Sequence, residues 1–175
     1  MPILPDVLKA GLKVVFCGTA VSTRSAQIGA YYAGPGNQFW IALHHVGLTP
    51  RLLLPQEYPM LPDYGIGLTD VVKECFGMDH QLQAGDFDPA AVRHKIEQFA
   101  PQAVAFNGKR AARAFYGLKD SAQIAYGRQP KPCGTSVIFV LPSTSAAAYN
   151  FVPAKRDATY EHWKAVAAFV KDLTG

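Results

Sequence analysis

The sequence has few cysteines, and they lie far apart. Cys17, Cys75 and Cys133 form no CxxC pair, whereas a structural zinc or iron–sulfur site takes about four clustered ligands. The five histidines form no HxxH or HExxH pattern. We therefore expect three reduced thiols, no metal and no cofactor.

Long apolar runs are also missing. None approaches the roughly 20 residues of a membrane-spanning helix, and the N-terminus has no basic segment followed by a long apolar one. We therefore expect no membrane partner and a cytoplasmic location. Hydrophobic residues make up 49% of the chain and charged residues 17%, which argues against disorder and fits one domain over residues 1–175.

Short apolar segments alternate with amphipathic ones along the chain. Four apolar segments have the length of strands and end in turn residues, namely 13–18, 66–70, 103–107 and 136–141. Strands separated by helices predict an α/β fold, a three-layer α/β/α domain whose mostly parallel central sheet has about four to five strands.

The helices between these strands carry recognisable end signals. We expect a helix over 37–46 with Asn37 as its N-cap and a second one behind Asp88, where Pro89 fits the first turn. Two further helices are predicted over "GKRAARAFYG" and over 160–173. The segment "YGRQPKPCG" is predicted to be a loop.

Parallel sheets bind ligands outside the carboxyl ends of their strands. In this chain that rule selects the loops after Gly18, Asp70, Asn107 and Leu141. These four loops also have the most unusual residue combinations in the sequence, so we expect the functional site there.

Five segments resemble, in order and spacing, the mismatch-specific uracil and thymine DNA glycosylases of the uracil-DNA glycosylase superfamily. They are "LKVVFCG", "AGPGNQFW", "GLTPRLLLPQE", "DYGIGLTDVV" and "VLPSTS", and the likeness covers nearly the whole chain. It implies an enzyme that flips a damaged base out of DNA and hydrolyses its N-glycosidic bond. The segment "LPSTS" also resembles a branch of the superfamily that acts on hypoxanthine.

Two motifs depart from the family pattern. The family's water-aligning Asn or Asp stands two residues after the motif glycine, and Ala20 holds that place here. An alanine can neither orient water nor offset a developing positive charge. In the second motif, the Asn or His that contacts the leaving base falls at Ser143, followed by Thr144 and Ser145.

Asp70 is the expected replacement for the lost polar side chain. It ends the strand "GIGLTD", which the resemblance places beside the first motif loop, and a carboxylate can align water and stabilise positive charge. The alternative is that Asp70 caps the segment beginning at Val71 or holds the Thr19 loop by hydrogen bonds. Ser22 and Thr23 are weaker candidates, because short loop hydroxyls usually bind the backbone.

The resemblance also implies the residues that contact the base. The backbone N–H of Thr19 matches a position that meets the flipped base, and the ring of Tyr32 matches the aromatic that stacks on it. Ser143 could donate to a pyrimidine oxygen. Ordinary packing for Tyr32 and a local cap for Ser143 remain open as alternatives. Ala20 and Ser145 complete the expected base-contacting set.

The net charge of +4 is compatible with a polyanionic partner. Phosphate contacts are expected from basic residues near the predicted site, and the alternative for each is a solvated surface charge. Tyr149 or Phe151 could wedge into the duplex, or pack under their own loop. The expected DNA-binding set is Arg24, Lys109, Arg128, Tyr149, Lys155 and Arg156.

Three functions are consistent with these residues. The first is a monomeric glycosylase that excises uracil from DNA and releases free uracil, with hypoxanthine or mismatched thymine as alternative targets. The second is a module that binds damaged or abasic DNA without cleaving it, because of Ala20. The third is a protein that binds a small nucleoside, which the absence of a GxxxxGK[ST] phosphate loop and the presence of basic loops disfavour.

Overall fold

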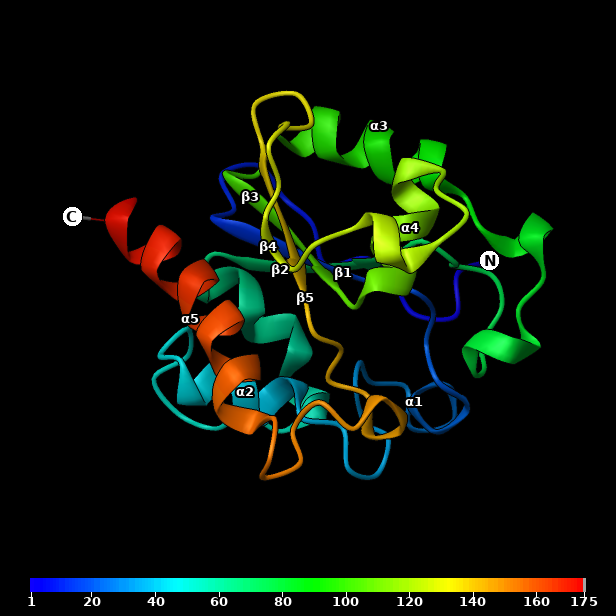
Figure 1. Cartoon of the computed structure of the whole chain (residues 1–175), viewed down its shortest axis with the longest axis horizontal. Helices are drawn as coiled ribbons and strands as arrows, with labels where there is room; N and C mark the ends of the chain where they lie inside the picture. The colour runs from blue at the N-terminus through cyan, green and yellow to red at the C-terminus, as the bar shows by residue number, and fades with distance from the viewer. Residues whose placement is uncertain (175) are drawn as a thin grey trace.

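The computed structural model describes residues 1–174 and contains one five-stranded sheet with the strand order β2-β1-β3-β5-β4 (Figure 1). Neighbouring strands among the first four are parallel, whereas the short β4 is antiparallel to β5. This confirms the predicted α/β fold and mostly parallel sheet. The strands are β1 (Val14–Gly18), β2 (Ile66–Asp70), β3 (Ala103–Asn107), β4 (Gly127–Arg128) and β5 (Val137–Leu141).

Helices cover both faces of this sheet (Figure 1). On one face, α3 (Pro89–Phe99) and α4 (Lys109–Tyr116) pack on Cys17, Phe106 and Val140. On the other, α2 (Phe39–His45) and α5 (Arg156–Asp172) pack on Phe16 and Leu141. Burial on both faces explains why these strands read as continuous apolar runs.

The remaining elements are short. They are the helix α1 (Thr23–Ile28) and the 3-10 helices η1 (Pro55–Tyr64), η2 (Asp79–Gln81), η3 (Ala84–Asp86), η4 (Ser121–Gln123) and η5 (Ala146–Ala148). Most lie in the connections at the carboxyl ends of the strands. None of the helices within residues 1–174 combines the length and the apolar character that crossing a membrane requires.

The structure corrects several predicted boundaries. Helix α2 begins at Phe39 rather than at Asn37, whose side-chain oxygen instead accepts a hydrogen bond of 3.0 Å from the Phe39 N–H. Helix α5 begins one turn earlier than predicted, so that Arg156 is helical. Arg128 is not in a loop but in β4, a strand that arises only from pairing with β5, and Pro130 prevents its extension.

The N-terminal segment adds an antiparallel bridge to the edge strand β2. Val7 and Leu68 exchange two backbone hydrogen bonds of 2.9 Å. Gly67 allows this approach, because a Cβ at that position would stand 2.6 Å from the Val7 carbonyl oxygen. The bridge fixes the preceding residue, Asp6, behind the carboxyl end of β2.

Candidate active site

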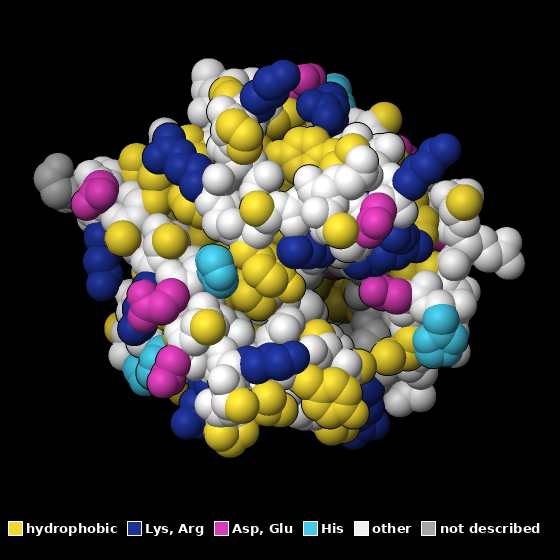
Figure 2. Space-filling model, in the orientation of Figure 1, with side chains coloured by type: hydrophobic (Ala, Val, Ile, Leu, Met, Phe, Trp, Pro, Cys, Tyr) yellow, Lys and Arg dark blue, Asp and Glu magenta, His cyan; other side chains and the backbone are white. Residues whose placement is uncertain are grey.

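A cavity of about 440 Å³ opens at the carboxyl ends of the parallel strands (Figure 2). Its walls come from the residues that follow β1, β2, β3 and β5, the four loops that the sequence selects. The size is within the range of cavities that enclose small organic ligands, roughly 300–1,000 Å³. Seven of the predicted site residues line it, namely Thr19, Ala20, Tyr32, Asp70, Lys109, Ser143 and Ser145.

Asp70 is the ionisable group at the floor of this cavity. Its side chain is 2% exposed. The backbone N–H groups of Val71 and Val72 donate to the carbonyl oxygens of Gly18 and Thr19, so the Asp70 carboxylate caps neither the segment after it nor the Thr19 loop. Of its two oxygens, Oδ2 is buried without a hydrogen-bond partner.

A cluster of charged side chains lies behind Asp70. The Lys73 ammonium is 3.6 Å from Asp70 Oδ2 and 3.0 Å from Asp6 Oδ1, and the Lys95 ammonium is 2.6 Å from Asp6 Oδ2. The hydroxyl of Thr69 also donates to Asp6. Two lysines thus balance two carboxylates, and the N-terminal segment supplies one of the four charges.

These charges act on Asp70 in opposite directions. Burial raises the pKa of the Asp70 carboxyl to about 6 from its ordinary 3.8, Lys73 opposes that rise, and Asp6 adds to it. The group therefore ionises near neutral pH. A carboxylate of this kind is suited to accept a proton or to hold water beside a developing cation.

Tyr32 forms the adjacent part of the wall. Its backbone is left-handed, with φ of 53°, and its ring stacks on Phe39 with the two centroids 4.0 Å apart. The Tyr32 hydroxyl is buried and has no hydrogen-bond partner. By contrast, the neighbouring Tyr31 hydroxyl donates to the Pro5 carbonyl and accepts from Lys73. Of these two adjacent tyrosines, Tyr32 alone has an unsatisfied hydroxyl.

Gly18 separates the Tyr32 hydroxyl from the Asp70 carboxylate. A Cβ on Gly18 would stand 2.7 Å from Asp70 Oδ1 and 2.9 Å from the Tyr32 oxygen. Both side chains therefore close over the bare α-carbon of this glycine. A glycine is required here by space and not by backbone conformation.

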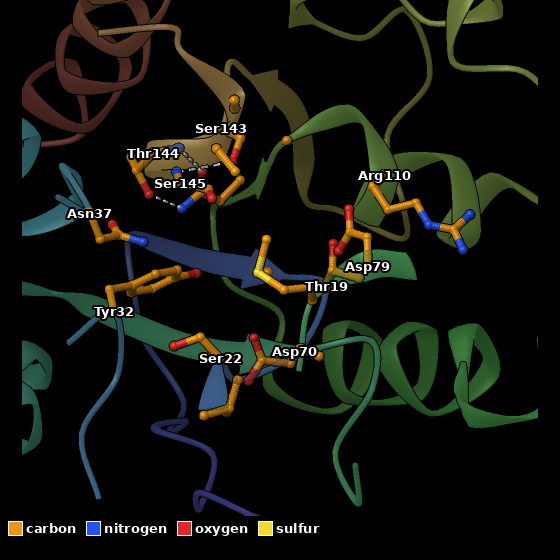
Figure 3. A pocket seen from close by; sticks show the side chains of 18 of the residues that line it. Thr19, Ser22, Tyr32, Asn37, Asp70, Asp79, Arg110, Ser143, Thr144 and Ser145 are labelled. Carbon is orange, nitrogen blue, oxygen red and sulfur yellow. Dashed lines mark hydrogen bonds between the residues drawn. The ribbon is translucent and has the colours of Figure 1, made fainter. Parts of the chain in front are cut away.

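The opposite wall is built by the ends of β3 and β5 (Figure 3). The side chain of the buried Asn107 donates to the Thr144 hydroxyl (2.8 Å) and accepts from the Thr144 N–H (3.0 Å). The Ser143 hydroxyl accepts from the Ser145 N–H at 3.1 Å, which is the local cap considered above as an alternative. Its own hydrogen remains available to a ligand.

Basic side chains stand at the cavity mouth. Helix α4 starts there behind Gly108, without a side-chain cap on its first N–H groups. The Lys109 ammonium lies 4.4 Å from the centroid of the Tyr126 ring, and the Arg110 guanidinium lies 4.6 Å from that of Phe87. Aromatic contacts therefore hold both cations at the rim.

The other predicted DNA-binding residues lie outside the cavity lining. Arg24 is exposed on α1, and Lys155 and Arg156 are exposed at the start of α5. Arg128 lies on β4 near the Phe169 ring. Tyr149 is 67% exposed and left-handed, directly after residues 147–148, which do line the cavity.

Several site residues were not predicted from the sequence. The sequence predicts Asn107 only as a strand end and gives no role to Lys73. Residues 77–80, which follow β2, also line the cavity. The signal for Asn107 was present, since an amide ending a fully apolar strand must find a buried partner. Within residues 1–174, no three His, Cys, Asp or Glu side chains gather to hold a metal ion.

Residues 5–167 match the family profile described as "Uracil DNA glycosylase superfamily". The fold is similar to the solution NMR structure of a Methanosarcina acetivorans protein described as "a putative Uracil DNA glycosylase". That similarity has a TM-score of 0.58 at 20% sequence identity and covers 93% of this chain and 96% of the other. At such identity it concerns the fold alone, whereas the profile match extends over most of the sequence. The chain belongs to the uracil DNA glycosylase superfamily.

Proposed function

We propose that this protein is a monofunctional DNA glycosylase that hydrolyses the N-glycosidic bond of uracil in DNA, acting as a monomer and leaving an abasic site. The motif order favours the mismatch-specific uracil and thymine branch. The observation that carries the proposal is Asp70, a carboxylate 2% exposed on the floor of a cavity of about 440 Å³. In this proposal Asp70 orients water and offsets positive charge, which Ala20 cannot do.

Asp70 would serve at two moments of the reaction. Before bond cleavage, an ionised carboxylate orients a water molecule toward C1′ of the sugar. As the glycosidic bond breaks, the same negative charge offsets the positive charge that develops on the sugar. Because the pKa of Asp70 is raised to about 6 by burial, the ionised form dominates above that pH.

Three groups would bind the extruded base. The Thr19 N–H would donate to a base oxygen, the Tyr32 ring would stack on the base, and the Ser143 hydroxyl would donate from the opposite wall. All three residues line the same cavity, together with Ala20 and Ser145. The face of Tyr32 that Phe39 does not cover is the one available for stacking.

The start of α4 would assist the departing base and hold the DNA. The positive end of the helix dipole and the Lys109 ammonium both favour an anion at the cavity mouth. The more distant Arg24, Arg128, Lys155 and Arg156 would contact flanking phosphates. Tyr149, exposed at the rim, would occupy the space that the flipped nucleotide leaves.

The direct test is strand cleavage at abasic sites. Oligonucleotides with one uracil, single-stranded or paired with A or G, are incubated with the protein, and alkali then cleaves any abasic site. We expect product that depends on alkali and free uracil in equal amount. Borohydride should trap no protein–DNA adduct, since water and not an amine is the nucleophile. No product with any substrate would refute the assignment.

Two alternatives have their own support. The segment "LPSTS" keeps hypoxanthine and mismatched thymine open as targets, and the same assay with those bases decides among them. Ala20 favours a second class of function, a protein that binds damaged DNA without turnover. In that case, binding would persist with ordinary salt dependence while no substrate yields product.

A further inference from the structure

Two buried side-chain atoms stand out within residues 1–174, because they are polar and have no hydrogen-bond partner. They are the Tyr32 hydroxyl oxygen and Asp70 Oδ2. Asp70 Oδ2 faces Lys73 at 3.6 Å, whereas Asp70 Oδ1 and the Tyr32 oxygen both approach Gly18 on the cavity floor. The unsatisfied Tyr32 hydroxyl beside this carboxylate oxygen indicates a site for a polar ligand atom.

Ring stacking and backbone conformation both fix the position of the Tyr32 hydroxyl. The ring stacks on Phe39 with an interplanar angle of 26°, and the backbone occupies the left-handed region that bulky residues rarely adopt. A phenylalanine would make the same stacking contact without an unsatisfied hydroxyl. The hydroxyl therefore has a use that the ring alone does not provide.

The direction of the hydroxyl limits what it can bind. It lies in the plane of its ring, so if that ring stacks on the base, the hydroxyl cannot also reach the in-plane edge of the same base. Its partner must be a small group on the cavity floor. The Tyr32 oxygen and Asp70 Oδ1 both approach Gly18, lying 2.9 and 2.7 Å from the place that a Cβ on this glycine would take. A small group farther out above Gly18 would be within reach of both. In Figure 3 the Tyr32 hydroxyl points into the space between Asp70 and the Ser143–Ser145 wall.

We propose that Tyr32 is a second catalytic residue, whose hydroxyl holds the attacking water together with Asp70 above Gly18. The proposal rests on the hydrolytic function proposed above and extends it. The phenol donates to one lone pair of the water, and Asp70 accepts one of its hydrogens. The second lone pair is left free to face C1′.

The water oxygen forms a bond to C1′, and the C1′–N bond breaks with its electron pair leaving on the base. The water proton passes to the Asp70 carboxylate and returns to the released base or to solvent. Tyr32 keeps its proton throughout, since burial and the charge of Asp70 raise the pKa of the phenol well above its ordinary value.

The test compares Tyr32→Phe with the wild-type protein under single-turnover conditions. Phenylalanine keeps the stacking and removes only the hydroxyl, so we expect the excision rate to fall about 10- to 100-fold. The affinity for uracil-containing DNA should change less than about twofold. Tyr160→Phe is the matched control, because Tyr160 is a buried tyrosine on α5 outside the cavity lining.

Two results would overturn the proposal. Both are a wild-type excision rate in Tyr32→Phe. With unchanged DNA affinity, that rate would leave the hydroxyl without a role; with weakened DNA affinity, it would assign the hydroxyl to base recognition. Thermal denaturation checks that the variant is folded. The proposed function itself is tested by the wild-type protein alone: if that protein excises uracil and Tyr32→Phe does so equally well, only the role of the hydroxyl is refuted.

Discussion

Lys73 lies behind Asp70, with its ammonium nitrogen 3.6 Å from Asp70 Oδ2. It faces the carboxylate from outside the cavity lining, where it can influence the charge of Asp70 without touching a substrate. Asp6 and the Tyr31 hydroxyl hold Lys73 in place, each at 3.0 Å. The pKa of Asp70 therefore depends on Lys73, Asp6 and Lys95 together as well as on burial.

Replacing Lys73 should move the pH dependence of the reaction. With the pKa of Asp70 at about 6, the excision rate should rise with pH through that value and level off above it. Lys73 lowers the pKa of Asp70, whereas Asp6 raises it and Lys95 lowers it. In Lys73→Met the acidic limb of the pH–rate profile should therefore shift to higher pH. Lys164→Met, which removes an exposed ion pair with Glu161, should leave the acidic limb in place. An unshifted limb in Lys73→Met would show that Lys73 does not influence the ionisation of Asp70.

The buried carboxylate should also lower the stability of the protein at neutral pH. Folded Asp70 binds its proton more tightly than the unfolded chain does, with a pKa of about 6 against 3.8. Its contribution to stability is therefore fully present below 3.8 and lost as the pH rises through 6. An asparagine side chain at this position would not titrate. Asp70→Asn should be more stable than wild type above pH 6, by on the order of 2–3 kcal/mol.

Chemical denaturation at several pH values checks this expectation. The stability difference between Asp70→Asn and the wild type should be constant at alkaline pH down to a pH of about 6 and should shrink from there toward pH 3.8. The exposed Asp63 offers a control, since Asp63→Asn should produce no such trend. A difference that does not shrink below a pH of about 6, or a variant less stable than the wild type at alkaline pH, would show that Asp70 is not a strained buried charge.

Gly18→Ala should block the floor of the cavity. The added methyl group would stand 2.7 Å from Asp70 Oδ1 and 2.9 Å from the Tyr32 oxygen, so it would displace the two groups that are proposed to hold the attacking water. Because Gly18 is not left-handed, alanine does not strain its backbone. We expect a loss of excision rate of about 10-fold or more in a folded protein. Gly85→Ala, where a Cβ meets nothing within 4 Å, should keep full activity, and equal rates in the two variants would contradict the assignment.

Much of this fold follows from local sequence, and the exceptions have a common physical cause. Strands β2 and β3 have the predicted bounds, because their apolar runs are buried on both faces. Strand β4 was missed because it exists only through pairing with β5. Tertiary context decides such short elements, and local propensity does not.

The same distinction applies to the site. Asp70 and Ser143 were predicted at the cavity because each ends a strand or follows one closely. The partners around them come from far along the chain: 63 residues separate Asp6 from Thr69, and 37 separate Asn107 from Thr144. No sequence pattern reports those contacts. For this reason the sequence could suggest Asp70 as a functional group, but not Asp6, which shares Lys73 with it.

The basic residues should differ in how much each contributes to DNA affinity. Lys109 lines the cavity mouth at the start of α4, whereas Arg128 lies on β4 near Phe169. Lys109→Ala should weaken binding to uracil-containing DNA and reduce the slope of log K against log salt by about 1. Arg128→Ala should have the smaller effect. Fluorescence anisotropy over a range of salt concentrations measures both, and the reverse order would show that the DNA lies along a different edge.

The catalytic role of Asp70 is tested most directly by the single-turnover rate of uracil excision by Asp70→Asn at a pH of about 8, where wild-type Asp70 is ionised. The rate is compared with those of the wild type and of Asp63→Asn. Asparagine keeps the shape of the side chain and removes the charge that aligns water and stabilises the sugar cation. We expect a loss of about 100-fold or more, with binding to uracil-containing DNA retained and Asp63→Asn fully active. An Asp70→Asn protein that excises uracil at the wild-type rate would show that this carboxylate is not catalytic.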